Sequence, residues 1–276
     1  SKLRRTPARR AGSVPGRPRK ANIALVVSLS LHTMASIKPK PRKAACDPGT
    51  ENSRTRQDCK LESMRICIDI QAAITQRAGV GRYTRHLVEH LGLGAGSDQV
   101  RLFYFDFQRR GIPFPVANAE LCPFRGLPGR LVQKAWKTIH WPPFEWFAGR
   151  ADLYHFPNFV LPPLGDGRSV VTVHDMSFLR YPEFAEPRNQ RFLAATIRRT
   201  VERADAIITD SEFSAAEIRD CLPVDSARLH PIYPGIGADL RAPDRPAIDA
   251  CRKRLGLDRP YLLSVGTLAP RKNFAF

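Results

Sequence analysis

The sequence predicts an α/β protein built around a doubly wound parallel sheet. Short apolar segments alternate along the chain with longer segments whose apolar residues recur at helical spacing. Strands that alternate with helices in this way form parallel βαβ units, with helices on both faces of the sheet. Apolar residues make up 43% of the 276 residues, which is enough for a packed core and excludes a wholly disordered chain.

The elements follow one another in a regular order. Arg65–Gln71 is predicted as a buried strand, Arg82–Leu91 as a helix and Val100–Asp106 as a second strand. Further strands are expected at Asp152–Phe156, Ser169–Val173, Ala206–Thr209, Leu229–Tyr233 and Tyr261–Val265, and further helices at Pro187–Arg203, Ser211–Cys221 and Pro246–Leu255. Ligands of such sheets bind beyond the carboxyl ends of the strands, so the loops that follow the strands are the candidate sites.

Positive charge is concentrated before Met64. The chain has a net charge of +18, and residues 1–63 account for +11 of it. The composition of this segment predicts a disordered basic extension; a signal peptide around residues 23–31 and a nucleic-acid-binding arm are the alternatives. Because the segment lacks aromatic residues for base stacking and residues 64–276 are only mildly basic, we expect no nucleic acid partner.

The six cysteines show no pattern of a metal site or a disulfide framework. No two cysteines are spaced as CxxC, and no cysteine lies near a histidine at the spacing of a zinc site. No apolar run reaches the roughly 18 residues that a membrane span needs. We therefore predict a reduced, cytoplasmic chain without a metal site.

Two glycines lie between the first predicted strand and its helix. Gly79 and Gly81 let backbone N–H groups approach an anion, and the helix N-terminus adds partial positive charge. A dinucleotide fingerprint needs a third glycine where Thr84 stands, so a phosphate or sugar phosphate is favoured over NAD. A turn without a ligand is the alternative.

Polar residues follow two inner strands. His174 and Asp175 come after Ser169–Val173, where an imidazole can hydrogen-bond a sugar hydroxyl or stabilise developing charge. Asp175 is expected to orient that ring or to cap a turn, and a histidine bonded to nearby backbone is the alternative. Ser211 follows the next strand, where it holds a phosphate or hydroxyl or only caps the helix.

A basic pair follows the last predicted strand. After Gly266 and a proline turn come Arg271 and Lys272. Arginine supplies a planar fork and lysine a point charge, a combination that suits a diphosphate. A solvated pair of surface charges is the alternative.

All three tryptophans lie within residues 130–147, at positions 136, 141 and 146. This segment is basic, aromatic and amphipathic, which indicates contact with a membrane surface or a lipid-linked acceptor. Aromatic residues at such spacing pack more often in a core, so helices packed on the sheet are the favoured alternative.

Six segments of the chain occur in a recognisable order. They are GVGRY, DLYHFPNFVLPP, VVTVHD, ADAIITDSEFSAAEI, the turn Tyr233-Pro234-Gly235 and YLLSVGTLAPRKN. In this order and spacing they resemble retaining glycosyltransferases of family 4 with the GT-B fold, and the resemblance covers residues 64–276. The chain is most similar to mannosyltransferase-like members that build bacterial polysaccharides.

The resemblance implies two Rossmann-like domains that face each other across a cleft. The first binds the acceptor and the second a nucleotide-sugar donor, without an obligatory metal or other cofactor. By resemblance, Gly79 and Gly81 lie near the donor diphosphate, Arg271 and Lys272 hold that diphosphate, and His174 lies near the transferred sugar.

The remaining matches are placed beside the cleft. The resemblance puts Asn158 on the acceptor side, and it assigns sugar or acceptor binding to Asp175, Ser211 and Glu212. The expected donor is GDP-mannose or another nucleotide sugar. The expected acceptor is a saccharide or a lipid-linked saccharide, which places the protein in the cytoplasm or peripherally at the inner membrane.

The resemblance also divides the chain. Residues 1–63 form the basic extension, residues 64–240 an acceptor-binding domain, and residues 241–276 a linker and the start of a truncated donor-binding domain. The paired glutamates that hold the donor in this family have no match here, so we expect little or no transferase activity from this chain alone. A non-catalytic remnant that binds a sugar or a partner is the alternative function.

Overall fold

A parallel sheet is the frame of the computed structural model, which describes residues 63–77, 79–94, 96–235, 241–266 and 272–274. Its strands are β1 (Arg65–Asp69), β2 (Gln99–Phe105), β3 (Glu120–Phe124), β4 (Leu153–Phe156), β5 (Arg168–Thr172), β6 (Ala206–Thr209) and β7 (Leu229–Pro231). The predicted doubly wound parallel sheet, and with it the α/β fold class, is confirmed. The predicted basic extension, apart from Ser63, lies outside the described residues.

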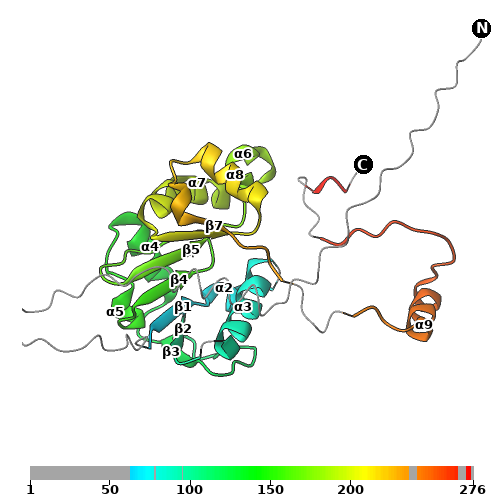
Figure 1. Cartoon of the computed structure of the whole chain (residues 1–276), viewed down its shortest axis with the longest axis horizontal. Coiled ribbons are helices and arrows are strands. Elements are labelled where there is room, and N and C mark those ends of the chain that lie inside the picture. Colours follow the sequence, from blue (N-terminus) through cyan, green and yellow to red (C-terminus); the bar gives the residue numbers. More distant parts are fainter. Residues whose placement is uncertain (1–62, 78, 95, 236–240, 267–271, 275–276) are drawn as a thin grey trace, which may run out of the picture.

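The order of the seven strands is β3-β2-β1-β4-β5-β6-β7 (Figure 1). The chain builds outward from β1 through β2 to β3, and then returns to place β4 on the other side of β1. From β4 it builds outward in the opposite direction, through β5 and β6 to β7. The order therefore reverses between β1 and β4, and in doubly wound sheets the carboxyl ends of such a pair border the ligand crevice.

Helices cover both faces of the sheet. The helices α2 (Gln71–Thr75) and α3 (Val80–Gly94) pack on one face. The other face carries α4 (Gly129–Thr138), α5 (Glu145–Ala148), α6 (Ser177–Arg180), α7 (Pro187–Arg203) and α8 (Glu212–Cys221). The remaining helices are η1 (Pro182–Phe184), η2 (Ser226–Arg228) and α9 (Arg245–Leu255). Within the described residues, no helix combines the length and the apolar character that crossing a membrane requires.

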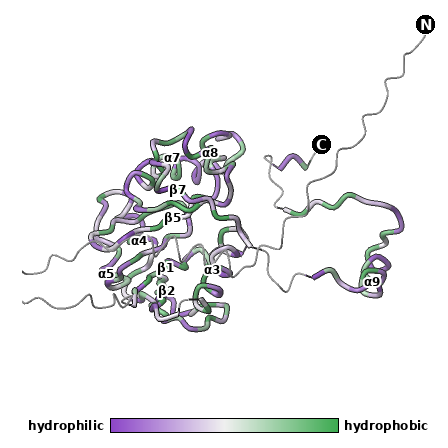
Figure 2. Tube along the Cα trace, viewed as in Figure 1, coloured by the Kyte–Doolittle hydropathy of each residue, from purple (hydrophilic) through white to green (hydrophobic). Residues whose placement is uncertain are grey.

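The core has two layers because successive strand residues point to opposite faces. In β1, Ile66 and Ile68 pack toward α3, whereas Cys67 packs toward α5 and α7. All three side chains are buried, and burial of each large aliphatic side chain contributes about 1.5–3 kcal/mol. Figure 2 shows hydrophobic residues along the central strands and hydrophilic residues along α9, which has no buried residue.

Three sequence predictions about elements are corrected. Tyr261–Val265 is not a strand, because these exposed residues pair with no described strand. The predicted first strand ends at Asp69, since Gln71 already begins α2. The sequence analysis did not predict β3, where Pro123 interrupts the strand pattern; proline is tolerated there because β3 lies at the sheet edge.

Candidate active site

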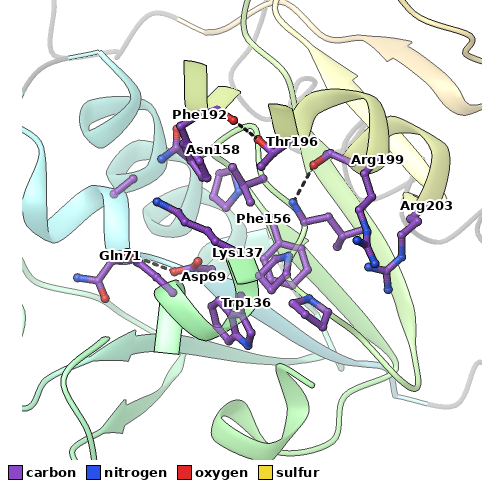
Figure 3. A pocket seen from close by; sticks show the side chains of 18 of the residues that line it. Asp69, Gln71, Trp136, Lys137, Phe156, Asn158, Phe192, Thr196, Arg199 and Arg203 are labelled. Atoms are coloured by element: carbon purple, nitrogen blue, oxygen red, sulfur yellow. Dashed lines mark hydrogen bonds between the residues drawn. The ribbon is translucent and has the colours of Figure 1, made fainter. Parts of the chain in front are cut away.

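A cavity of about 550 Å³ opens where the strand order reverses. Its walls come from α4 and α7, and α2 and the loop after β4 complete it (Figure 3). Asn158, which the sequence analysis assigned to the acceptor side, lines this cavity beside Pro157. The cavity therefore occupies the ligand crevice that the fold predicts.

Asp69 is the acidic residue of this cavity, and the sequence analysis missed it. It ends β1 two residues after Cys67 and so points to the same face as Cys67, toward the cavity (Figure 3). One carboxylate oxygen accepts a hydrogen bond from the backbone N–H of Gln71 at 2.9 Å. Burial raises the pKa of Asp69 from 3.8 to about 6, which outweighs that hydrogen bond. A carboxyl group with this pKa can accept a proton from a sugar hydroxyl, or it can bind the hydroxyl through a hydrogen bond.

His174 lies behind the cavity wall, directly after the end of β5. Its Nε2 atom is 3.1 Å from the carbonyl oxygen of Pro157, and its Nδ1 atom is 2.9 Å from Oδ2 of Asp210. Both partners accept hydrogen bonds, so the ring satisfies both when each nitrogen carries a proton. The ring is also packed edge-on against Tyr83 and Phe159, with centroid distances of 4.9 and 5.4 Å. The Pro157 carbonyl, the Asp210 carboxylate and the two rings therefore fix the orientation of His174.

The residue that pairs with the His174 ring is Asp210 rather than Asp175. Asp175 accepts hydrogen bonds from the backbone N–H and the hydroxyl of Ser177, at 3.0 and 2.7 Å, and so caps the start of α6. The capping alternative for Asp175 is therefore the one the structure shows. The other oxygen of Asp210, Oδ1, is buried and has no hydrogen-bond partner among the described residues.

The loop beside His174 has a strained backbone. Phe159 has a φ of 58°, a left-handed conformation that bulky residues rarely adopt and that costs about 1–2 kcal/mol. Packing of its ring against His174 and Phe178 and a 2.9 Å hydrogen bond from its N–H to Thr172 hold it in place. The flanking residues Asn158 and Val160 line the cavity.

Ser211 caps a helix and also supports the His174 loop. Its hydroxyl oxygen accepts a hydrogen bond from the N–H of Ser214 at 3.1 Å, as expected for the N-cap of α8. The Ser214 hydroxyl in turn donates to the carbonyl oxygen of His174 at 3.1 Å. Glu212 is exposed in the first turn of α8 and does not line the cavity. The structure thus gives Ser211 a positioning contact, and sugar binding by Ser211 and Glu212 stays a prediction.

Gly79 and Gly81 in the first loop are glycines for different structural reasons. Gly79 precedes α3 with a φ of 53° and has open space where a side chain would lie. Gly81 is buried in the first turn of α3, and a Cβ atom there would collide with the carbonyl of Gln76. Close packing explains Gly81, and diphosphate binding at Gly79 and Gly81 stays a prediction.

The basic pair is only partly described. Arg271 lies outside the described residues, and Lys272 is exposed. In the described part of the chain, Lys272 forms no hydrogen bond or ion pair, and it does not line the cavity. Diphosphate binding by Arg271 and Lys272 therefore stays a prediction.

The tryptophans divide between the core and the surface. Trp136 packs against Phe105, Phe144 and Phe147, and its indole N–H donates to the carbonyl of Pro142 at 2.7 Å. Trp141 and Trp146 pack edge-on against each other at 5.2 Å and are 53% and 64% exposed. The core interpretation holds for Trp136, whereas the other two rings remain available on the surface.

A match between the sequence and a family profile identifies the family of the chain. Residues 77–240, more than half of the chain, match the sequence profile of Glycosyltransferase Family 4. The chain belongs to glycosyltransferase family 4. The resemblance predicted from the order of the motifs is confirmed, and the doubly wound sheet is the Rossmann-like domain that this resemblance implies.

A curated relative of this family 4 chain is the O-antigen chain mannosyltransferase B of Escherichia coli, which is 27% identical over 208 residues. The alignment covers 71% of the chain and 54% of the relative, so the chain spans about half the length of this relative. Two structures of the wall teichoic acid polymerase TagF align with TM-scores of 0.36 and 0.37 and identities of 12% and 14%. They cover 61% and 71% of the chain, and the chain covers 39% and 44% of theirs. Scores this low carry no conclusion.

Among the described residues of the family 4 chain, no group of three His, Cys, Asp or Glu side chains is placed to hold a metal ion. Of the residues described above, the structure places Asp69 and Asn158 in the cavity lining and His174 with Asp210 behind it. Pro157 joins the two groups, because it lines the cavity and its carbonyl accepts the His174 hydrogen bond.

Proposed function

We propose that this family 4 chain is the acceptor-binding part of a retaining glycosyltransferase that moves a hexose from a nucleotide sugar to a saccharide or lipid-linked acceptor. The cavity at the reversal of strand order, lined by Asp69 and Asn158 and backed by His174, is the observation that carries the proposal. Mannose, from GDP-mannose, is the first choice because the curated relative is a mannosyltransferase.

In this proposal the cavity orients the acceptor. Asp69 accepts a hydrogen bond from the attacking hydroxyl, and the Asn158 amide fixes the acceptor ring beside it. When the donor is bound, the Nε2 atom of His174 exchanges the Pro157 carbonyl for the negative charge that develops at the transferred sugar and the leaving diphosphate, while Nδ1 keeps its contact with Asp210. Asp210 holds the imidazole in that orientation, in the way a buried carboxylate orients an active-site histidine.

The donor side of the proposal needs no metal or other cofactor. Arg271 and Lys272 neutralise the leaving diphosphate, and backbone N–H groups at Gly79 add to that stabilisation. Residues 64–240 act as the acceptor-binding domain, and residues 241–276 lead into the donor-binding domain.

We further propose that the enzyme works in the cytoplasm and touches the inner membrane peripherally. The exposed rings of Trp141 and Trp146 stand with exposed Leu131 and Ile139 on the segment that also carries Lys134. Aromatic and aliphatic side chains among cations favour the interface of an anionic bilayer. Such contact brings a lipid-linked acceptor to the cavity.

The experiment is a transfer assay with GDP-mannose on this chain and on the product of the full reading frame. We expect little or no transfer by residues 1–276 and robust transfer by a longer product. In that product His174→Ala should lower turnover more than donor affinity, as for a group that acts at the transition state. Lys272→Ala should weaken donor binding. A change confined to acceptor affinity in His174→Ala, or unchanged donor affinity in Lys272→Ala, contradicts the assigned role.

The second candidate function is a non-catalytic module that binds a sugar or a partner. It is favoured by the Tyr261–Val265 segment, which is exposed and unpaired in the described structure. Saccharide binding by a longer product that transfers no sugar would establish this alternative.

A further inference from the structure

The cavity walls carry more positive than negative charge. Lys137 extends from α4, and Arg199 and Arg203 extend from α7, whereas Asp69 is the acidic residue of the lining (Figure 3). None of these three cations forms an ion pair within the described residues, although other arginines of the same part of the chain do. Three cations that share one cavity without carboxylate partners are a site in need of an anion.

The two arginines repel each other in the absence of an anion. They lie one helical turn apart on α7, and their guanidinium groups lie together in Figure 3. Burial and the nearby Arg199 charge both lower the pKa of Arg203. Like charges at this spacing destabilise a helix, and an anion bound between them would relieve that repulsion.

Lys137 lies across the cavity from the two arginines (Figure 3). Its ammonium group lies 3.8 Å from the centroid of the Phe192 ring, which belongs to α7, so the side chain spans from α4 toward α7. The ring attracts the ammonium and fixes its position without neutralising its charge. The floor between the walls is apolar and includes Pro162 and Pro163, which strengthens electrostatic attraction inside the cavity.

We propose that Arg199 and Arg203 bind a phosphate or diphosphate group carried by the acceptor, and that Lys137, across the cavity, attracts the same anion. The inference rests on the proposed function and names the chemical class of its acceptor. Guanidinium forks match the oxygen geometry of phosphate, and three cations exceed the single charge of a carboxylate. A cavity of about 550 Å³ lies within the range of small-ligand sites and has room for such a group beside a sugar.

The test measures binding of inorganic pyrophosphate to the chain by isothermal titration calorimetry. We expect saturable binding that weakens at least tenfold in Arg199→Gln/Arg203→Gln, because the variant loses two charge-assisted hydrogen-bond donors to the anion. Lys137→Gln, on α4, should weaken pyrophosphate binding at least severalfold. Because it leaves α7 unchanged, its effect cannot come from misfolding of α7. Arg198→Gln is the matched control, since Arg198 is exposed on α7 and outside the cavity.

Two further arms give the result its meaning. Lys272→Gln removes a predicted diphosphate contact elsewhere, so pyrophosphate binding lost there but kept in the arginine double variant overturns the inference. Equal binding by wild type and both cavity variants also overturns it. Tighter binding of a short isoprenyl diphosphate than of mannose 1-phosphate indicates a lipid-linked acceptor, and the reverse order indicates a soluble sugar phosphate. In either case, loss of that binding in the cavity variants supports the site. Because no donor or transfer is involved, failure here is distinguishable from failure of the transfer assay.

Discussion

Asp69→Asn should stabilise the fold at neutral pH while it removes the proposed acceptor contact. Burial raises the pKa of the Asp69 carboxyl from 3.8 to about 6, so ionisation at pH 7 is less favourable in the folded than in the unfolded state. A gap of about two pKa units corresponds to about 3 kcal/mol. Because water enters the open cavity, we expect about 2 kcal/mol. The asparagine oxygen can still accept the hydrogen bond from Gln71.

The assay is urea unfolding of wild type and variant between pH 4 and pH 7. Below pH 3.8 the wild-type carboxyl is protonated in both states, and its cost appears as pH rises toward 6 and then stays constant. The stability advantage of Asp69→Asn should therefore grow across this window. Asp166→Asn, at an exposed position, is the control for a generic loss of charge. A wild type more stable than Asp69→Asn at pH 7, or a difference that does not change with pH, would falsify the reasoning.

Two further predictions concern the folded part of the chain. Gly81→Ala should lower the free energy of unfolding by about 2 kcal/mol or more because its Cβ would collide with the Gln76 carbonyl. Gly79→Ala has open space but a positive φ, so it should lower the free energy of unfolding by about 1 kcal/mol. Equal losses of the two variants in urea unfolding would contradict this. Burial and His174 lower the pKa of His155 from 6.5 to about 3, so protons bind the unfolded state preferentially below pH 6.5 and stability falls by about 2 kcal/mol by pH 5. His155→Leu should lose that part of the pH dependence, and parallel wild-type and variant stabilities at pH 7 and pH 5 would refute the assignment.

Local patterns predicted the parallel sheet because each buried strand is a short apolar run between turn residues. Those runs also placed His174 at the end of β5 and Asn158 just beyond β4, and the structure puts both beside the cavity. Ligands bind beyond the carboxyl ends of strands, so the site could be located once the strand ends were predicted from the sequence. The family resemblance likewise depended on the order of segments.

The partners inside the site were not predictable because they depend on pairings between distant segments. Asp210 stands 36 residues after His174, and only the pairing of β5 with β6 brings the two together. Arg199 and Arg203 look in the sequence like an ordinary solvated helix face. Asp69 was assigned to the inside of a strand, since nothing local marks the point at which β1 ends and α2 begins.

The division between the cavity walls and its floor has a consequence for divergence within the family. Lys137, Arg199 and Arg203 are exposed on α4 and α7, whereas the floor residues Pro162 and Pro163 are buried. Substitutions at exposed helix positions usually change stability by no more than about 0.5 kcal/mol, whereas changes in a packed core cost several times more. Under the proposed function, acceptor preference can therefore change through single substitutions in the walls without unfolding the domain.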